Sequence, residues 1–167
     1  MAELDQVWSQ MLAQAESGAT AAGRRDIADY LRLRATNDAI RRAGVGWLLD
    51  TFIEIATTPR GLAIQPAVDR EEPHRFERGS SHMVGTRLNI RHGVRCLSIE
   101  AGWARTPSDG IMARGSLAFA RITHFGMPRS AAEIRLVHRD TLPAWITDDG
   151  SVIDSAELER HFELLLS

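Results

Sequence analysis

The first third of the chain has apolar residues every three or four positions, which predicts three helices. In the first, apolar residues share one face: Leu4, Val7, Trp8, Met11, Leu12 and Ala15. A second, more polar helix is expected over 24–39. Gly44-Val45-Gly46 is expected to break it, and a third helix over 47–56 should end before Thr58-Pro59.

From Met83 onward the apolar pattern changes to every second residue, which predicts a β-hairpin over 84–103 with His92-Gly93 as its turn. Closure at this turn pairs Ile90 with Arg95 and Leu88 with Leu97. One face is then apolar and faces the core: Val84, Leu88, Ile90, Leu97, Ile99 and Trp103. The other face carries polar residues and the single cysteine: Arg87, Asn89, Arg91, Cys96, Ser98 and Glu100.

Further strands are expected over 117–125, 133–138 and 143–147, and an amphipathic helix over 154–166 starts at Asp154, which has capping-box spacing to Glu157. The charged segment 69–78 is expected to be a connection. These elements predict an α+β fold: three N-terminal helices packed on a five- to six-stranded, mainly antiparallel sheet, with a C-terminal helix. The helical segment 1–60 and the sheet segment 61–167 are expected to form one compact domain together.

The composition is that of an ordinary soluble domain, with 44% hydrophobic and 25% charged residues in a chain of 167. The N-terminal residues lack the basic start of a signal peptide, and no apolar run has the length of a membrane span. One cysteine, Cys96, cannot form an internal disulfide. A cytoplasmic protein without membrane contact is therefore expected.

Charge is segregated along the chain although the formal net charge is only −2. Residues 82–139 hold nine arginines and three acids, whereas residues 140–167 hold seven acids and one arginine. All 20 basic residues are arginines, whose planar side chains can pair bidentately with a carboxylate or phosphate. Either the acidic tail neutralises the basic block, which the capping-box helix favours, or the basic face binds an anionic partner.

Two groups of residues are candidates for a ligand site. Arg87, Arg91 and Arg135 could share one sheet face, which Arg121 would extend. The long loop that follows the hairpin adds Trp103, Arg105, Asp109 and Arg114 beside glycines. In the alternative interpretation, the sheet face is solvated or covered by a helix, and its arginines pair with Glu100, Glu133 and the acidic tail. Trp103 then anchors the loop to the core, and Arg105 and Asp109 tie its ends together.

Several kinds of chemistry are disfavoured. The six histidines lack metal-ligand spacing, so neither a metal nor another cofactor is expected. The predicted register puts Asn89, not a base, beside Cys96, which argues against a catalytic thiol. No glycine-rich motif has the context of a nucleotide site. The aromatic residues fall mostly at core positions, which disfavours nucleic acid as a partner.

Three functional hypotheses follow, and the residues favour a non-catalytic role. The first is a binding or regulatory domain that engages an anionic small ligand or an acidic protein surface through the candidate residues above. The second is a small enzyme on an anionic substrate, with His82, Asp109 or Glu100 as acid or base. The third is an assembly subunit that docks, on a second copy or a larger complex, through the apolar face of the first helix, including Trp8, Met11 and Leu12.

Overall fold

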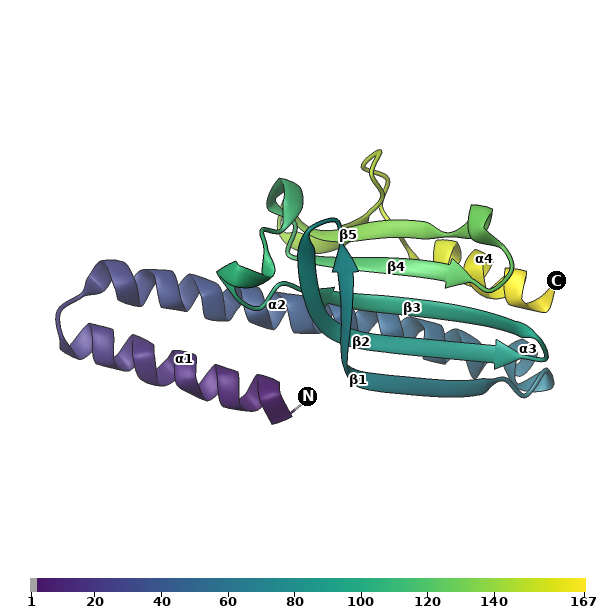
Figure 1. Ribbon diagram of the computed structural model, residues 1–167, viewed down its shortest axis with the longest axis horizontal. Coiled ribbons are helices and arrows are strands. Elements are labelled where there is room, and N and C mark those ends of the chain that lie inside the picture. Colours follow the sequence, from purple (N-terminus) through teal and green to yellow (C-terminus); the bar gives the residue numbers. More distant parts are fainter. Residues whose placement is uncertain (1–2) are drawn as a thin grey trace. The chain divides into compact units, whose positions relative to one another are not determined.

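The structure is a computed structural model that describes residues 3–167, apart from the side chains of Leu4 and Ala113 (Figure 1). The chain forms two compact units, which we call the helical unit, Met1–Arg42, and the sheet unit, Ala43–Ser167. Helix α2, Arg25–Ala56, begins in the first unit and ends in the second. The predicted contribution of Leu4 to the face of the first helix lies outside the described side chains.

The helical unit is an antiparallel pair formed by α1, Glu3–Ala21, and the first part of α2. The Trp8 indole Nε1 donates a hydrogen bond of 3.1 Å to Asp38, and the guanidinium of Arg34 lies 4.9 Å from the centre of the Trp8 ring. Near the turn, Arg32 pairs with Glu16 at 3.0 Å. These contacts fix the two helices side by side.

The predicted break at Gly44-Val45-Gly46 is wrong, because α2 runs without interruption through these residues. A glycine in a helix costs about 1 kcal/mol relative to alanine. Burial of Leu48, Leu49 and Phe52, each with no exposed surface, offsets that cost. A Cβ at Gly44 would overlap the side chain of Leu136, so Gly44 lets the helix approach the sheet closely.

The sheet unit contains one antiparallel sheet of six strands in chain order, together with the end of α2 and helices α3, Pro59–Ala63, and α4, Ser155–Leu166. The α+β class and the C-terminal helix are thus confirmed, and α3 is an additional short helix. The strands are β1 Ala67–Arg78, β2 Ser81–His92, β3 Arg95–Trp103, β4 Ala118–His124, β5 Ala132–Arg139 and β6 Leu142–Ile146.

The prediction that 69–78 is a connection is wrong, because this segment lies within β1. Seven successive residues of the strand are exposed, so the alternation that marks a half-buried strand is missing. Pro73 lies at a shift in register between Glu71 and His74, and an edge strand tolerates a proline at such a place.

The predicted β2–β3 register is wrong by two residues. Leu88 pairs with Ile99 rather than Leu97, and Ile90 pairs with Leu97 rather than Arg95. A slip of two residues leaves every side chain on its original face, because side chains alternate along a strand. All six residues predicted to face the core are therefore buried: Val84, Leu88, Ile90, Leu97, Ile99 and Trp103.

We call the face of the sheet that carries these core residues the inner face, and the opposite face the outer face. The β1–β2 hairpin bends over the outer face (Figure 1). The bend passes Gly85, which pairs directly with Gly102. A Cβ at Gly85 would overlap the carbonyl of Ala101, so only glycine permits this close crossing. The folded hairpin encloses a small second core formed by Phe76, Met83 and Phe119, with Met112 packed against it.

Helix α4 packs on the inner face, as the contact between its His161 and His124 of β4 indicates. Its apolar side buries Leu158, Phe162 and Leu165. The predicted start is confirmed, since the Asp154 side chain accepts a hydrogen bond of 2.9 Å from the backbone NH of Glu157. The inner face is thus covered by helices, whereas charged residues lie on the outer face.

Candidate functional site

Charged residues of the outer face form one row across five strands. Direct cross-strand pairing places them in alternating order of charge: Glu71, Arg87, Glu100, Arg121 and Glu133. Arg87 pairs with Glu71 at 2.5 Å, and Arg121 pairs with Glu133 at 3.3 Å and with Glu100 at 3.6 Å. Opposite charges on neighbouring strands stabilise such a row. Arg87 and Arg121 are therefore committed to internal partners.

The row also contains His74, whose side chain is largely buried. Its Nε2 lies 2.8 Å from Glu100 Oε1, and its Nδ1 lies 3.7 Å from Glu71. The imidazole stacks on Phe76 with the ring centres 5.7 Å apart. Arg78, from the folded end of β1, lies over the Phe119 ring at 4.2 Å and pairs with Glu133 at 3.9 Å. The row is thus joined to the small second core.

The acids that pair with the sheet arginines do not come from the C-terminal helix, although the capping-box pattern favoured neutralisation by the tail. In α4, Glu157 pairs with Arg160 of the same helix, and Glu163 pairs with Arg60 of α3. Because α4 lies on the inner face, the sheet separates it from the charged row. Neutralisation of the sheet arginines is intramolecular, but it comes from glutamates of the sheet itself.

The loop candidates mostly hold the loop itself in place. Trp103 is buried at the end of β3, and the guanidinium of Arg105 lies 3.9 Å from the centre of its ring. Arg105 also donates to the carbonyl of Val84 at 3.3 Å. Asp109 accepts hydrogen bonds from the backbone NH and the hydroxyl of Thr106, and these bonds lower the pKa of Asp109. The burial of Trp103 agrees with the alternative interpretation that this residue anchors the loop to the core.

The remaining candidates, Arg91, Arg114 and Arg135, make no ion pair among the described residues. Arg91 is exposed near the end of β2, and Arg114 is exposed with a positive φ of 54°. Arg135 is half-buried on β5, directly opposite Phe119, and its Nε atom is buried without a hydrogen-bond partner. The NH of Leu117 donates to the carbonyl of Leu136, so the segment after Arg114 runs beside the position of Arg135.

An apolar pocket of about 370 Å³ lies between α2 and β6. Its deep wall is formed by buried Leu136, Trp145 and Ile153, and Trp145 is held by a hydrogen bond of 2.9 Å from its Nε1 to the carbonyl of Gly44. No ionisable side chain is among the residues that line it within the described chain: Ala43, Gly44, Trp47, Leu136, Leu142, Pro143, Ala144, Trp145, Val152 and Ile153.

The rim of this pocket is unusually apolar for a protein surface. Trp47 is 43% exposed, Val152 is 49% exposed and Leu142 is 73% exposed. Large apolar side chains that gather in this way around a concavity often mark a binding site. The pocket volume falls within the range of small-molecule sites, about 300–1,000 Å³.

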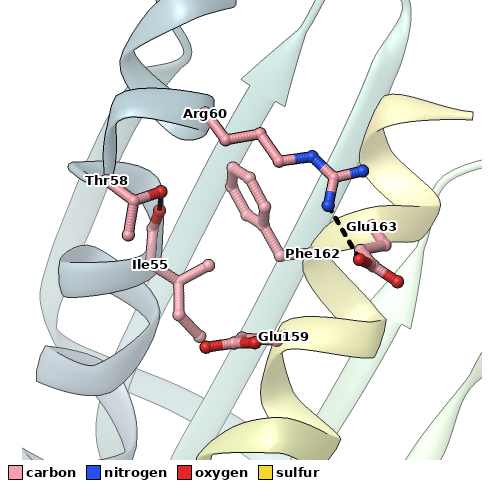
Figure 2. Close-up of a pocket in the computed structure, with 6 residues that line it drawn as sticks. All are labelled: Ile55, Thr58, Arg60, Glu159, Phe162 and Glu163. Atoms are coloured by element: carbon pink, nitrogen blue, oxygen red, sulfur yellow. Dashed lines mark hydrogen bonds and ion pairs between the residues drawn. The ribbon is translucent and has the colours of Figure 1, made fainter.

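A smaller pocket of about 170 Å³ lies between the end of α2 and α4 (Figure 2). Arg60 reaches across Phe162 toward Glu163, with which it pairs at 2.9 Å. Ile55 and Phe162 form the apolar part of the wall, and Glu159 adds a second carboxylate. Because its one lining arginine is already bound to a carboxylate, this pocket offers no unpaired cation to an anionic ligand.

Two histidines pack against each other between β4 and α4, of which His124 is buried and His161 half-buried. His124 Nε2 lies 3.0 Å from His161 Nδ1, and the rings stack with their centres 5.3 Å apart. Burial, and to a lesser degree the neighbouring His161, lowers the pKa of His124 to about 4. Burial also lowers the pKa of His161, which Glu157 partly opposes. Neither histidine lines the two pockets described above.

Other chemical features are sparse in the part of the chain that the structure describes. It contains no group of three or more His, Cys, Asp or Glu side chains that could hold a metal ion. None of its helices combines the length and hydropathy that a membrane span requires. Cys96 is half-buried, with its sulfur 3.5 Å from the hydroxyl of Ser98.

The seven predicted site residues are thus distributed over several regions and do not converge on one pocket. Sequence reasoning missed the apolar pocket, since its walls come from segments about 100 residues apart. The sequence predicts a strand over 143–147 and a helix over 47–56 but does not indicate that the two meet.

Comparison with protein-family models, with curated proteins and with solved structures found no match for this chain.

Proposed function

We propose that the protein is a non-catalytic binding domain that holds a small, uncharged apolar ligand in the pocket between α2 and β6. The observation that carries the proposal is the 370 Å³ pocket with two tryptophans in its wall and no ionisable side chain among its described lining residues. A charged group placed there would lose its hydration without gaining a partner, so an uncharged ligand fits best.

Two further observations support binding over catalysis. The two histidines with lowered pKa lie outside both of the pockets described above, so neither pocket is lined by one of them. The deep wall is also preorganised, because Trp145 is fixed by Gly44 before any ligand enters. The single cysteine, Cys96, fits a reducing compartment, so we propose a cytoplasmic location for this activity.

The experiment is a fluorescence titration with N-phenyl-1-naphthylamine, an uncharged apolar probe. Leu142→Asp puts a carboxylate on the pocket rim and should weaken binding about tenfold, since an apolar ligand would desolvate that charge at a cost of ~1–3 kcal/mol. Leu142 is 73% exposed, so the substitution leaves the core intact. Val94→Asp, at a position 88% exposed in the β2–β3 turn, is the matched control and should bind like the wild type.

Equal weakening by both substitutions, or none by Leu142→Asp, would place the probe elsewhere and reject the pocket. A wild-type protein that does not bind the probe would also count against the proposal. Circular dichroism of each variant separates lost binding from lost folding.

A second candidate function keeps the anionic ligand, with Arg135 and Arg114 as its recognition residues. It is favoured by the buried, unpartnered Nε of Arg135, because such a donor gains a full hydrogen bond when an anion arrives. Phosphate serves as the probe. Arg135→Gln should abolish a phosphate-induced shift in the unfolding temperature, whereas Arg129→Gln should not. The same shift in wild type and Arg135→Gln would remove this candidate.

A further inference from the structure

Two turns lie side by side at one end of the sheet, the first between β2 and β3 and the second between β4 and β5 (Figure 1). The backbone NH of Phe125, in the second turn, donates a hydrogen bond of 2.9 Å to the carbonyl of Cys96, near the start of β3. Arg95 donates a hydrogen bond of 3.0 Å to the sulfur of Met127. These contacts join the two turns into one surface.

We call this surface, formed by residues 91–96 and 125–130, the turn surface. Two large apolar side chains on it lie mostly in solvent, since Val94 is 88% exposed and Phe125 is 74% exposed. Single exposed apolar residues are common on proteins. Here, however, two of the four most exposed large apolar side chains of the described chain lie on adjoining turns. Their apolar area is available to a partner.

The charge carried by the turn surface is positive. Its charged residues are Arg91, Arg95 and Arg129, and no acid occurs in 89–99 or in 122–132. None of these three arginines makes an ion pair with another described residue. They differ in this respect from the arginines of the charged row, which are paired with glutamates of the sheet.

Acids from other elements do not neutralise this charge. Glu133, the second residue of β5, is paired with Arg121. Glu163 of α4 is paired with Arg60 of α3. Asp69, near the start of β1, is one acid against three arginines. The turn surface therefore keeps a net positive charge beside its two exposed apolar side chains.

A partner that fits must combine negative charge with an apolar interior. A membrane with anionic lipids does so, because its headgroups attract arginines and the boundary of its acyl chains takes up apolar side chains. A fluid lipid layer also adapts to side chains that project from two separate turns, whereas a folded acidic protein would need a matching cavity for each. Single-stranded nucleic acid fits less well, since Val94 has no ring on which a base could stack. We propose that the turn surface binds anionic membranes, with Val94 and Phe125 inserted between the headgroups.

This contact is peripheral. The expectation of no membrane contact rests on the absence of an apolar run of spanning length, which argues against a span but not against contact through two turns. Attachment of this kind is reversible, because each arginine near an anionic surface strengthens binding only about fivefold.

Co-sedimentation of the full chain with lipid vesicles tests this inference. The wild type should bind vesicles that contain about 30% phosphatidylserine, and it should bind pure phosphatidylcholine vesicles at least about tenfold more weakly. Phe125→Ala should weaken binding to the phosphatidylserine vesicles about tenfold, because it removes an inserted ring. Arg91→Glu should weaken it at least about tenfold, because an attraction is replaced by a repulsion.

Two matched control variants should bind these vesicles like the wild type. Ile111→Ala removes an apolar side chain that is 87% exposed, and the carbonyl of Ile111 lies near Ser81, at the opposite end of β2 from the turn surface. Arg139→Glu reverses an exposed charge at the end of β5 that is away from the turn surface. Circular dichroism of each variant separates lost binding from lost folding.

Insertion has its own test in a Cys96→Ser background. A nitrobenzoxadiazole label on Val94→Cys should shift its emission to the blue when phosphatidylserine vesicles are added, whereas the same label on Ile111→Cys should not respond. A label on Val94→Cys that stays in water would overturn insertion of the turns.

A wild type that does not bind phosphatidylserine vesicles, or control variants that lose binding as Arg91→Glu does, would overturn the inference. Binding of poly-glutamate or single-stranded RNA in place of the vesicles would assign the turn surface to an acidic protein or to nucleic acid instead. The apolar pocket shares no lining residue with the turn surface in the described chain. A vesicle-free titration of the wild type with N-phenyl-1-naphthylamine therefore tests the proposed function separately.

Discussion

Acidification should destabilise the protein through the buried His124 and its half-buried neighbour His161. In the folded chain the pKa of His124 is lowered to about 4, against an ordinary value of 6.5 in the unfolded chain. Between pH 4 and pH 6.5, His124 is mostly protonated in the unfolded state and mostly neutral in the folded state. The stability contributed by the neutral imidazole is therefore complete above pH 6.5 and is lost as pH falls toward 4.

The size of the effect follows from the pKa difference. When His124 is protonated in the unfolded state but not in the folded state, the free energy of unfolding falls by up to about 3 kcal/mol, at 1.36 kcal/mol per unit of pKa. At pH 5 about 2 kcal/mol of this would already be lost relative to pH 7.5. His124 is only 7% exposed, so solvent screening does not reduce the figure greatly. The lowered pKa of His161 acts in the same direction.

Urea unfolding followed by circular dichroism at pH 7.5 and pH 5 measures this loss. The wild type should lose about 2 kcal/mol more between the two pH values than His124→Gln, whose side chain does not titrate. Since pH 5 is above the ordinary pKa of most carboxyl groups, acidic residues contribute little to the difference. His92→Gln, at the exposed end of β2, is the control and should follow the wild type.

Equal pH dependence in wild type and His124→Gln would refute the reasoning. It would mean that His124 is solvated, or protonated at a similar pH, in the folded chain.

Two further substitutions test the packing of the outer face. Gly85→Ala should destabilise the fold by at least about 3 kcal/mol, because a Cβ there overlaps the carbonyl of Ala101. Gly46→Ala, with open space around it, should be neutral or stabilising. Thermal unfolding compares the two variants, and similar unfolding temperatures would contradict the close crossing at Gly85. Glu100→Gln should lower the free energy of unfolding by about 1–3 kcal/mol, since His74 and Arg121 both lose a charged partner. Glu133→Gln, at a more exposed position, should lower it by less than ~1 kcal/mol. Denaturant unfolding that ranks the two variants in the reverse order would show that the row is not centred on Glu100.

The sheet could be predicted from the sequence where one face is buried and the other is not. The alternation from Val84 to Trp103 correctly placed all six residues predicted to face the core, although the pairing was off by two residues. A turn that closes two residues earlier or later leaves the faces unchanged, so periodicity alone cannot choose the register. The observed pairing of Gly85 with Gly102 depends on the bend of the hairpin, which is a tertiary feature.

Other elements could not be predicted because the local pattern conflicts with the tertiary structure. The β1 strand is exposed along most of its length, so its side chains resemble those of a loop. The glycines at 44 and 46 resemble a helix end, yet the helix continues through both, and Gly44 lies close to the side chain of Leu136. In both cases packing, rather than local propensity, decides the structure.

The charge segregation of the chain favoured neutralisation of the arginine-rich block by the acidic tail. In the structure, Arg87 and Arg121 pair with glutamates of the sheet instead. The sheet glutamates that neutralise Arg87 and Arg121 are three of the chain's 22 acids, and their roles follow only from cross-strand pairing. The apolar pocket also depends on pairing, since β6 and α2 meet only in the folded chain.

The most direct test of the proposed binding function uses the four tryptophans as internal reporters. Trp47 and Trp145 line the apolar pocket, whereas Trp8 lies in the helical unit and Trp103 lies beneath Arg105. In ¹⁵N-labelled protein titrated with N-phenyl-1-naphthylamine, the indole NH signals of Trp47 and Trp145 should shift in a saturable way, and those of Trp8 and Trp103 should stay in place. Shifts confined to Trp8 or Trp103, or no shift at any indole, would contradict the assignment of the pocket as the binding site.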